Sequence, residues 1–206
     1  MKKSGIVFIF LLAVLSSGSE PCMQPVSPLP ATESIQWDIL LWGNKIGRLT
    51  GTHRLQENGL EVYEMSSESR AKIMWIDKEV SSHLEVVMKD GRMVSSVYKE
   101  IEDGKLKSWY TIKPNGNGYL ADGHKGPKNI QTAVLFPLCA IYFKELTKAA
   151  KGFDEAGADF VDLEPAGPGC WEYKANGGRY VVYTQNGRAT KIDVHTSLVK
   201  VVMEKR

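Results

Sequence analysis

The sequence is poor in the residues and motifs from which common catalytic sites are built. It has only three cysteines and four histidines among 206 residues. It contains no Gly-x-Ser-x-Gly turn, no His-Glu-x-x-His pair, no Gly-x-x-x-x-Gly-Lys loop and no Cys-x-x-Cys pair. These absences argue against the familiar hydrolase, metalloprotease, nucleotide-binding and dithiol redox classes. The sequence therefore predicts a protein that is not an enzyme and that uses no cofactor and no metal. An enzyme with scattered catalytic residues is the least favoured interpretation.

No apolar run is long enough to cross a membrane. The longest covers residues 6–15, about half of the ~20 residues that a spanning helix needs. Lys2 and Lys3 precede this run, and small residues follow it at 16–19. A basic start, a short apolar run and a small-residue zone are typical of an export signal. We predict a signal peptide over residues 1–19 and a periplasmic or secreted protein without a membrane span.

The sequence has little excess charge of either sign. Without Lys2 and Lys3 of the predicted signal, the 26 basic residues fall to 24, which equals the number of acidic residues. A balanced surface without a basic block does not favour nucleic acids or anionic membranes as partners.

The three cysteines leave two questions open. Cys22 follows the apolar run, as a lipidated cysteine would. The residues just before a lipidated cysteine are usually small and apolar, and Glu20 and Pro21 do not fit this preference. A lipoprotein anchored at Cys22 is therefore the alternative to a freely exported protein. Cys139 and Cys170 could form a disulfide in an oxidising compartment, but two unpaired buried thiols are favoured.

Turn signals separated by β-type segments fill most of the chain. Asp90-Gly91 and Asp103-Gly104 divide residues 84–113 into three segments rich in β-branched and aromatic residues. Asp-Gly suits a two-residue type I′ turn, which needs φ > 0 at both central positions. These residues are therefore predicted to form three consecutive antiparallel strands. Similar turn signals recur near both ends of the chain.

The domain organisation follows from proline and from hydrophobic spacing. Four prolines in residues 20–34 predict an extended linker, and residues 35–206 predict one domain. After Pro137, Leu138, Ile141, Tyr142 and Leu146 recur at spacings of three and four, which predicts a short helix. We expect a mainly β fold, an antiparallel meander forming a strongly curved sheet or open barrel, with this helix at its mouth or in its interior. Residues 153–169 are expected to be mostly loop.

Five stretches resemble an uncharacterised family of exported bacterial proteins, the domain of unknown function 6134. They are Gly43-Asn44-Lys45-Ile46-Gly47, the Asp-Gly meander, Ile141-Tyr142-Phe143-Lys144-Glu145, Phe153-Asp154-Glu155 with Gly157 and Phe160, and Tyr183-Thr184-Gln185-Asn186-Gly187. The resemblance implies a mostly β fold and carries no activity and no catalytic residues.

Candidate ligand-binding residues come from the predicted inner face of the sheet and from the helix. Residues 47–55 alternate so that Gly51 and His53 face inward, and glycines beside His53 leave room there. A core histidine that forms hydrogen bonds, and a sheet that curves at its glycines, are the favoured alternatives. Trp37, Ile141 and Tyr142 complete the candidate inner wall.

Two other constellations are weaker. Two Asp-x-His patterns each place two types of metal ligand on one face of a strand: Asp122 with His124, and Asp193 with His195. Lys191 lies on the same face as the second pair and disfavours a cation there. Residues 154–164 hold five acidic side chains whose spacing matches no calcium loop, so they are expected to be solvated.

The leading functional prediction is a non-enzymatic, exported cell-envelope protein that binds a small apolar molecule inside a β-shell. The alternative is a protein-binding or scaffolding module of the envelope whose core is filled.

Overall fold

A computed structural model describes residues 32–73, 76–148 and 150–206 of the chain. The predicted signal peptide, Cys22 and linker residues 20–31 lie outside the described residues. The first strand begins at Thr32, three residues before the predicted domain boundary at Ile35.

The described chain forms one antiparallel sheet of fourteen strands. The strands are β1 Thr32–Leu41, β2 Asn44–Leu55, β3 Leu60–Ile73, β4 Ile76–Lys89, β5 Arg92–Glu102, β6 Lys105–Asn115, β7 Gly118–Gly123, β8 Lys128–Ile130, β9 Ala150–Asp154, β10 Asp159–Gly167, β11 Cys170–Ala175, β12 Gly178–Gln185, β13 Arg188–His195 and β14 Lys200–Lys205. Their order is β8-β7-β6-β5-β4-β3-β2-β1-β14-β13-β12-β11-β10-β9.

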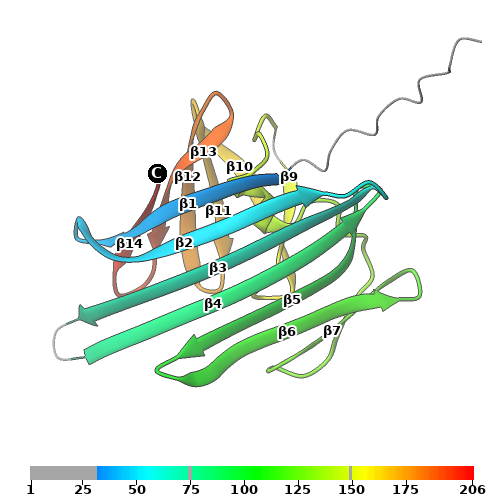
Figure 1. The fold of residues 1–206 in the computed structure, drawn as a ribbon, viewed down its shortest axis with the longest axis horizontal. Helices are drawn as coiled ribbons and strands as arrows, with labels where there is room; N and C mark the ends of the chain where they lie inside the picture. Colours follow the sequence, from blue (N-terminus) through cyan, green and yellow to red (C-terminus); the bar gives the residue numbers. More distant parts are fainter. Residues whose placement is uncertain (1–31, 74–75, 149) are drawn as a thin grey trace, which may run out of the picture.

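The first strand along the chain, β1, and the last, β14, are neighbours near the middle of the sheet. They pair antiparallel from Trp37 opposite Lys205 to Leu41 opposite Val201. Two meanders, β1–β8 and β9–β14, extend from this junction and curl toward each other, as Figure 1 shows. A parallel bridge between Pro137 and Phe153 ties the segment after β8 to β9. The prediction of a mainly β, antiparallel, strongly curved sheet is confirmed.

The predicted meander of residues 84–113 is confirmed as β4, β5 and β6. Asp90 and Gly91 have φ values of 50° and 72°, and Asp103 and Gly104 have values of 51° and 75°. Both pairs therefore adopt the positive φ that a type I′ turn requires.

The predicted helix is shorter than expected. Only Leu138–Tyr142 is helical, as a 3₁₀ helix, η1, with Pro137 as its N-cap. The chain then leaves the helix, and the Leu146 N–H donates 2.8 Å to the Gly187 carbonyl in the β12–β13 turn. Leu146 is buried but lies outside the helix. Its N–H is satisfied by the Gly187 carbonyl and not by a helical hydrogen bond.

The prediction that residues 153–169 are mostly loop is wrong. β9 ends at Asp154 and β10 covers Asp159–Gly167, so this acidic segment is a hairpin. In β10 Val161 and Leu163 are buried while Asp162 and Glu164 are exposed. This alternation with a period of two was hidden by the high charge of the segment.

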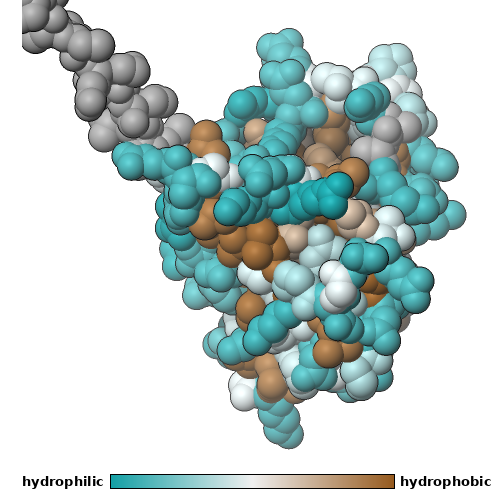
Figure 2. All heavy atoms as spheres, turned by 90° about the vertical axis from the view of Figure 1, so that its right-hand side faces the viewer, coloured by the Kyte–Doolittle hydropathy of each residue, from teal (hydrophilic) through white to brown (hydrophobic). Residues whose placement is uncertain are grey.

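The interior of the curled sheet is packed. Its largest completely buried side chains come from both meanders, from η1 and from the preceding segment; they include Trp37, Tyr63, Ile112, Val134, Ile141, Phe153, Leu163 and Ile192. At one end of the molecule, hydrophobic surface is split into separate groups among hydrophilic side chains (Figure 2). In the described ranges, no helix has the length and apolar character needed to cross a membrane.

Candidate functional site

An open cavity of about 150 Å³ lies on the inner side of the curled sheet, against η1. The inward faces of β2–β5 contribute Leu49, Met65, Ser82, Leu84 and Tyr98, η1 contributes Leu138, Cys139 and Tyr142, and the β9–β10 hairpin contributes Asp154, Glu155 and Ala156. The aliphatic wall residues Leu49 and Leu84 are only half-buried, although they face inward. The cavity therefore has a mostly apolar wall and an acidic end.

The β9–β10 turn brings two carboxyl groups to the acidic end. Asp154 accepts a hydrogen bond of 2.7 Å from Asn176 Nδ2 and one of 3.3 Å from the Ala156 N–H. A Cβ at Gly157 would lie 2.6 Å from Asp154 Oδ2 and 3.0 Å from Asn176 Oδ1, so a side chain there would displace this hydrogen-bonded pair. Burial raises the pKa of Asp154, and the Asn176 hydrogen bond opposes the rise. Asp154 thus stabilises the turn that presents its neighbour.

Glu155 is the unusual group of the cavity. Its residue is 3% exposed, and its Oε1 atom is buried without a hydrogen-bond partner. Burial raises its pKa to about 8, and the charge of Asp154 adds to the rise, while the backbone amides of Glu155 and Cys139 oppose it. A buried polar atom without a partner is costly, so Glu155 is suited to meet a group that enters the cavity.

Hydroxyl groups and a thiol surround these carboxyls. The Tyr98 hydroxyl donates 2.8 Å to Glu100 Oε2, and burial followed by this hydrogen bond raises the pKa of Tyr98. Burial, then the charge of Glu155, raises the pKa of the Cys139 thiol. Burial also raises the pKa of Tyr142. These groups are neutral at neutral pH and present aromatic surface and weak dipoles to the cavity, not positive charge.

Of the predicted inner-wall residues, Tyr142 alone lines this cavity. Trp37 lies behind it, with its ring edge-on to Tyr142 at a centroid distance of 5.2 Å. Ile141 is 1% exposed and belongs to the packed core. A Cβ at Gly51 would collide with Met65 Sδ and lie 3.1 Å from Phe143 Cζ, so neighbouring side chains fill the space beside this glycine.

His53 lies in a separate cluster that is already satisfied. It stacks on Tyr63 at 4.5 Å, and its Nε2 lies 3.3 Å from the carboxylate of Glu61. Glu61 also accepts from the Tyr63 hydroxyl at 2.7 Å and pairs with Lys144 at 2.9 Å. This geometry is that of a histidine whose Nε2 is hydrogen-bonded within the fold.

The remaining candidate groups are dispersed. Cys139 is a buried free thiol and Cys170 a half-buried one, so the structure contains no disulfide between them. Asp193 is 2% exposed and pairs with Lys191 and Lys200, at 3.4 and 2.7 Å. In the described part of the chain, no three His, Cys, Asp or Glu side chains are grouped so that they could hold a metal ion.

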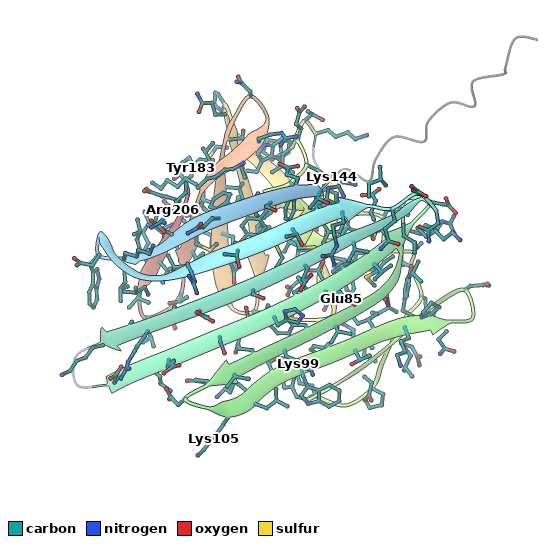
Figure 3. The ribbon with its side chains drawn as sticks, viewed as in Figure 1. Glu85, Lys99, Lys105, Lys144, Tyr183 and Arg206 are labelled. Carbon is teal, nitrogen blue, oxygen red and sulfur yellow. The ribbon has the colours of Figure 1, made fainter. Side chains whose placement is uncertain are left out.

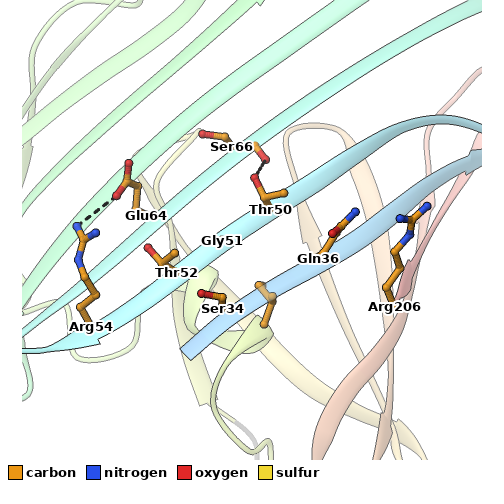
Figure 4. Close-up of a pocket in the computed structure, with 10 residues that line it drawn as sticks. Ser34, Gln36, Thr50, Gly51, Thr52, Arg54, Glu64, Ser66 and Arg206 are labelled. Atoms are coloured by element: carbon orange, nitrogen blue, oxygen red, sulfur yellow. Dashed lines mark hydrogen bonds and ion pairs between the residues drawn. The ribbon is translucent and has the colours of Figure 1, made fainter. Parts of the chain in front are cut away.

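A second hollow lies on the outer face of β1–β3, next to the C-terminal residue. It measures about 640 Å³ and is lined mainly by polar side chains: Ser34, Gln36, Thr50, Thr52, Arg54, Glu64, Ser66 and Arg206. Figure 4 shows Arg54 paired with Glu64, at 3.2 Å, and Thr50 bonded to the Ser66 carbonyl. Its charges are already paired within the sheet, so it presents a polar surface without an unsatisfied charged group.

Sequence reasoning missed Asp154 and Glu155, because charged residues in an apparent loop are usually solvated. Three of the five acidic residues are indeed exposed: Asp159, Asp162 and Glu164. A signal was present, however, since the Phe153-Asp154-Glu155 stretch and Gly157 are among the family-like motifs.

Comparison with known proteins identifies a family and a related fold. A crystal structure described as a "Beta-barrel-like Protein of Domain of Unknown Function DUF1849 from Brucella abortus" is similar to this chain with a TM-score of 0.57 and 12% identity. The match covers 88% of this chain and 97% of that one, and at this identity it shows the fold alone. A search of curated proteins found no match. The model of the family described as Domain of unknown function (DUF6134) matches residues 37–206, and the chain therefore belongs to that family.

Proposed function

We propose that this protein is a non-enzymatic, exported protein of the cell envelope that binds one small molecule in the cavity beside η1. The observation that carries the proposal is an open cavity of about 150 Å³ with an unpartnered, buried carboxyl oxygen, next to the packed interior of the sheet. The basic and apolar start of the sequence supports export. No common catalytic motif accompanies the cavity.

The volume limits the ligand. A cavity of roughly 150 Å³ accommodates a molecule about the size of benzene, whereas drug-sized ligands occupy about 300 Å³ or more. Leu49, Met65 and Leu84 offer an apolar wall to such a molecule. A small ligand, or one small end of a longer ligand, fits this space, and a whole lipid chain does not.

Native mass spectrometry of protein purified from its natural source tests this proposal. We expect a small bound adduct on the natural protein and its loss from Leu84→Trp, because the indole would occupy the cavity that Leu84 lines. Leu106→Trp is the matched control, since Leu106 is 57% exposed and lies away from the cavity. An adduct that persists in Leu84→Trp would place the ligand elsewhere.

The alternative, a protein-binding or scaffolding module, is favoured by one observation, the outer hollow of about 640 Å³ on β1–β3. In that case the natural protein would carry an envelope protein and no small adduct. Thr50→Arg and Ser66→Arg, on the outer face, would then release the partner, while Leu84→Trp would retain it.

A further inference from the structure

The charges around the cavity are unbalanced. Asp154 and Glu155 lie at one end, and Glu100 is hydrogen-bonded to the cavity residue Tyr98. Among the ion pairs of the described residues, none involves Asp154 or Glu155. The fold therefore supplies carboxyl groups here without supplying a cation to neutralise them.

The two carboxyl groups differ in how they are satisfied. Asp154 has both of its oxygens hydrogen-bonded, one to the Ala156 N–H of its own hairpin and the other to Asn176 in the β11–β12 turn. Glu155, which is 3% exposed, keeps Oε1 unpartnered at the cavity. The backbone amide and the thiol of Cys139 interact with the Glu155 carboxyl group, but no cation of the described residues pairs with it. A buried carboxylate is stable only when it is paired, so a positively charged group from outside the chain would stabilise the ionised form of Glu155.

The walls restrict the kind of cation. Leu49, Leu84 and Leu138 are apolar and offer no oxygen ligands to a hydrated metal ion. Tyr98 and Tyr142 also line the space, and tyrosine rings attract cations over their faces. An apolar wall, aromatic rings and one free carboxyl oxygen together suit an ammonium group that carries alkyl substituents.

We propose that the ligand of this cavity is a small organic cation, an alkylammonium or quaternary ammonium compound, whose charge is neutralised by Glu155. This inference rests on the proposed function and assigns the chemical class of its ligand. Binding requires that Glu155 lose its proton, because the ion pair forms only with the carboxylate. One proton is therefore released to the solvent for each cation bound.

Several titratable groups lie within charge range of Glu155. They are Asp154 from the same hairpin, Cys139 and Tyr142 from η1, and Tyr173 from β11. Asp154 is the one carboxylic acid among them, and burial raises its pKa as well. A proton released on binding between pH 6 and 8 comes from Glu155 or from the pair that it forms with Asp154.

Isothermal titration calorimetry of the unliganded full-length mature protein with choline tests the inference. The control ligand is 3,3-dimethylbutan-1-ol, which has the same shape as choline and no charge. We expect choline to bind more tightly than the alcohol, with an affinity that rises about ninefold from pH 6 to pH 7 and about fivefold from pH 7 to pH 8, as Glu155 ionises. Choline has no titrating ammonium proton, so this dependence reports on the protein.

Glu155→Gln should lower the choline affinity at pH 8 at least tenfold and remove its pH dependence, while leaving the binding of the alcohol unchanged. Glu85→Gln is the matched control, since Glu85 follows the cavity residue Leu84 and lies on the outer face of β4 (Figure 3). Preferential binding of the neutral alcohol, or choline binding without proton release, would overturn the cation inference and leave the small-molecule proposal standing. Binding of neither compound would also overturn it, and the mass-spectrometric adduct would decide the proposed function separately.

Discussion

Replacing Glu155 by glutamine is expected to stabilise the ligand-free protein at pH 8 and to change its stability little at pH 5. Burial raises the pKa of Glu155 from 4.5 to about 8 in the folded state. A group whose pKa is raised by folding contributes stability that is complete below its unfolded-state pKa. That contribution is lost as the pH rises toward the folded-state value.

The expected size follows from the same linkage. Between the two pKa values the folded protein holds one more proton than the unfolded chain, so the free energy of unfolding falls by about 1.4 kcal/mol per pH unit. From pH 5 to pH 8 the loss is about 3.5 kcal/mol, since the slope is smaller close to each pKa. Glutamine has nearly the same shape and cannot ionise, so Glu155→Gln should not show this loss.

Urea denaturation at pH 5 and pH 8 measures the difference. Glu85→Gln again serves as the control, because the same change on the outer face should leave the pH profile of the natural protein intact. Parallel profiles for the natural protein and Glu155→Gln would show that Glu155 ionises freely in the fold, which contradicts its description as a buried, unpartnered group.

Shortening Ile141 to alanine is expected to lower the free energy of unfolding by about 2–5 kcal/mol, the usual loss for a large-to-small change in a packed core. Ile141 is 1% exposed, and it lies on η1 without lining the cavity. Its removal therefore leaves a void among packed neighbours. The interior of the sheet depends on η1 as a core element.

Ile101→Ala is the matched control, since Ile101 is 41% exposed near the β5–β6 turn. Chemical denaturation of both variants against the natural protein checks the prediction. A loss below about 1 kcal/mol for Ile141→Ala would mean that η1 covers a partly open interior like a lid. The cavity would then be larger than the structure indicates, and larger ligands would become possible.

Local signals in the sequence predicted most of the first meander. A type I′ turn is encoded by two adjacent residues, so Asp90-Gly91 and Asp103-Gly104 located β4, β5 and β6 correctly. The alternation of residues 47–55 also identified the inward face of β2, where Leu49 lines the cavity and Gly51 is buried. Leu55, at the end of this face, is 44% exposed. These features depend on neighbours in the sequence.

The features that were missed depend on distant contacts. The pairing of β1 with β14 joins residues more than 150 positions apart, and no local pattern encodes it. The helix predicted after Pro137 was too long, because the Leu146 N–H bonds to the Gly187 carbonyl in a turn from the other meander. Helical spacing in the sequence could not reveal that competing partner.

The acidic hairpin shows the same limit at the candidate site. Asp154 is stabilised by Asn176, 22 residues away, and Glu155 is buried by walls from β2–β5 and η1. A charged residue in a sequence is predicted to be exposed to solvent, unless it is known which distant residues pair with it or bury it. The family-like motif at Phe153-Asp154-Glu155 indicated that this stretch matters, but not that its carboxyl groups face inward.

The central claim is that the cavity beside η1 is the binding site. Carbon-13 labelling of the methionine methyl groups, followed by NMR during a choline titration, tests it most directly, because Met65 lines the cavity. Met88 and Met93 are buried outside the cavity and serve as internal references. We expect a saturable shift of the Met65 methyl signal, with the Met88 and Met93 signals unchanged. An unchanged Met65 signal at a choline concentration that saturates binding would contradict it.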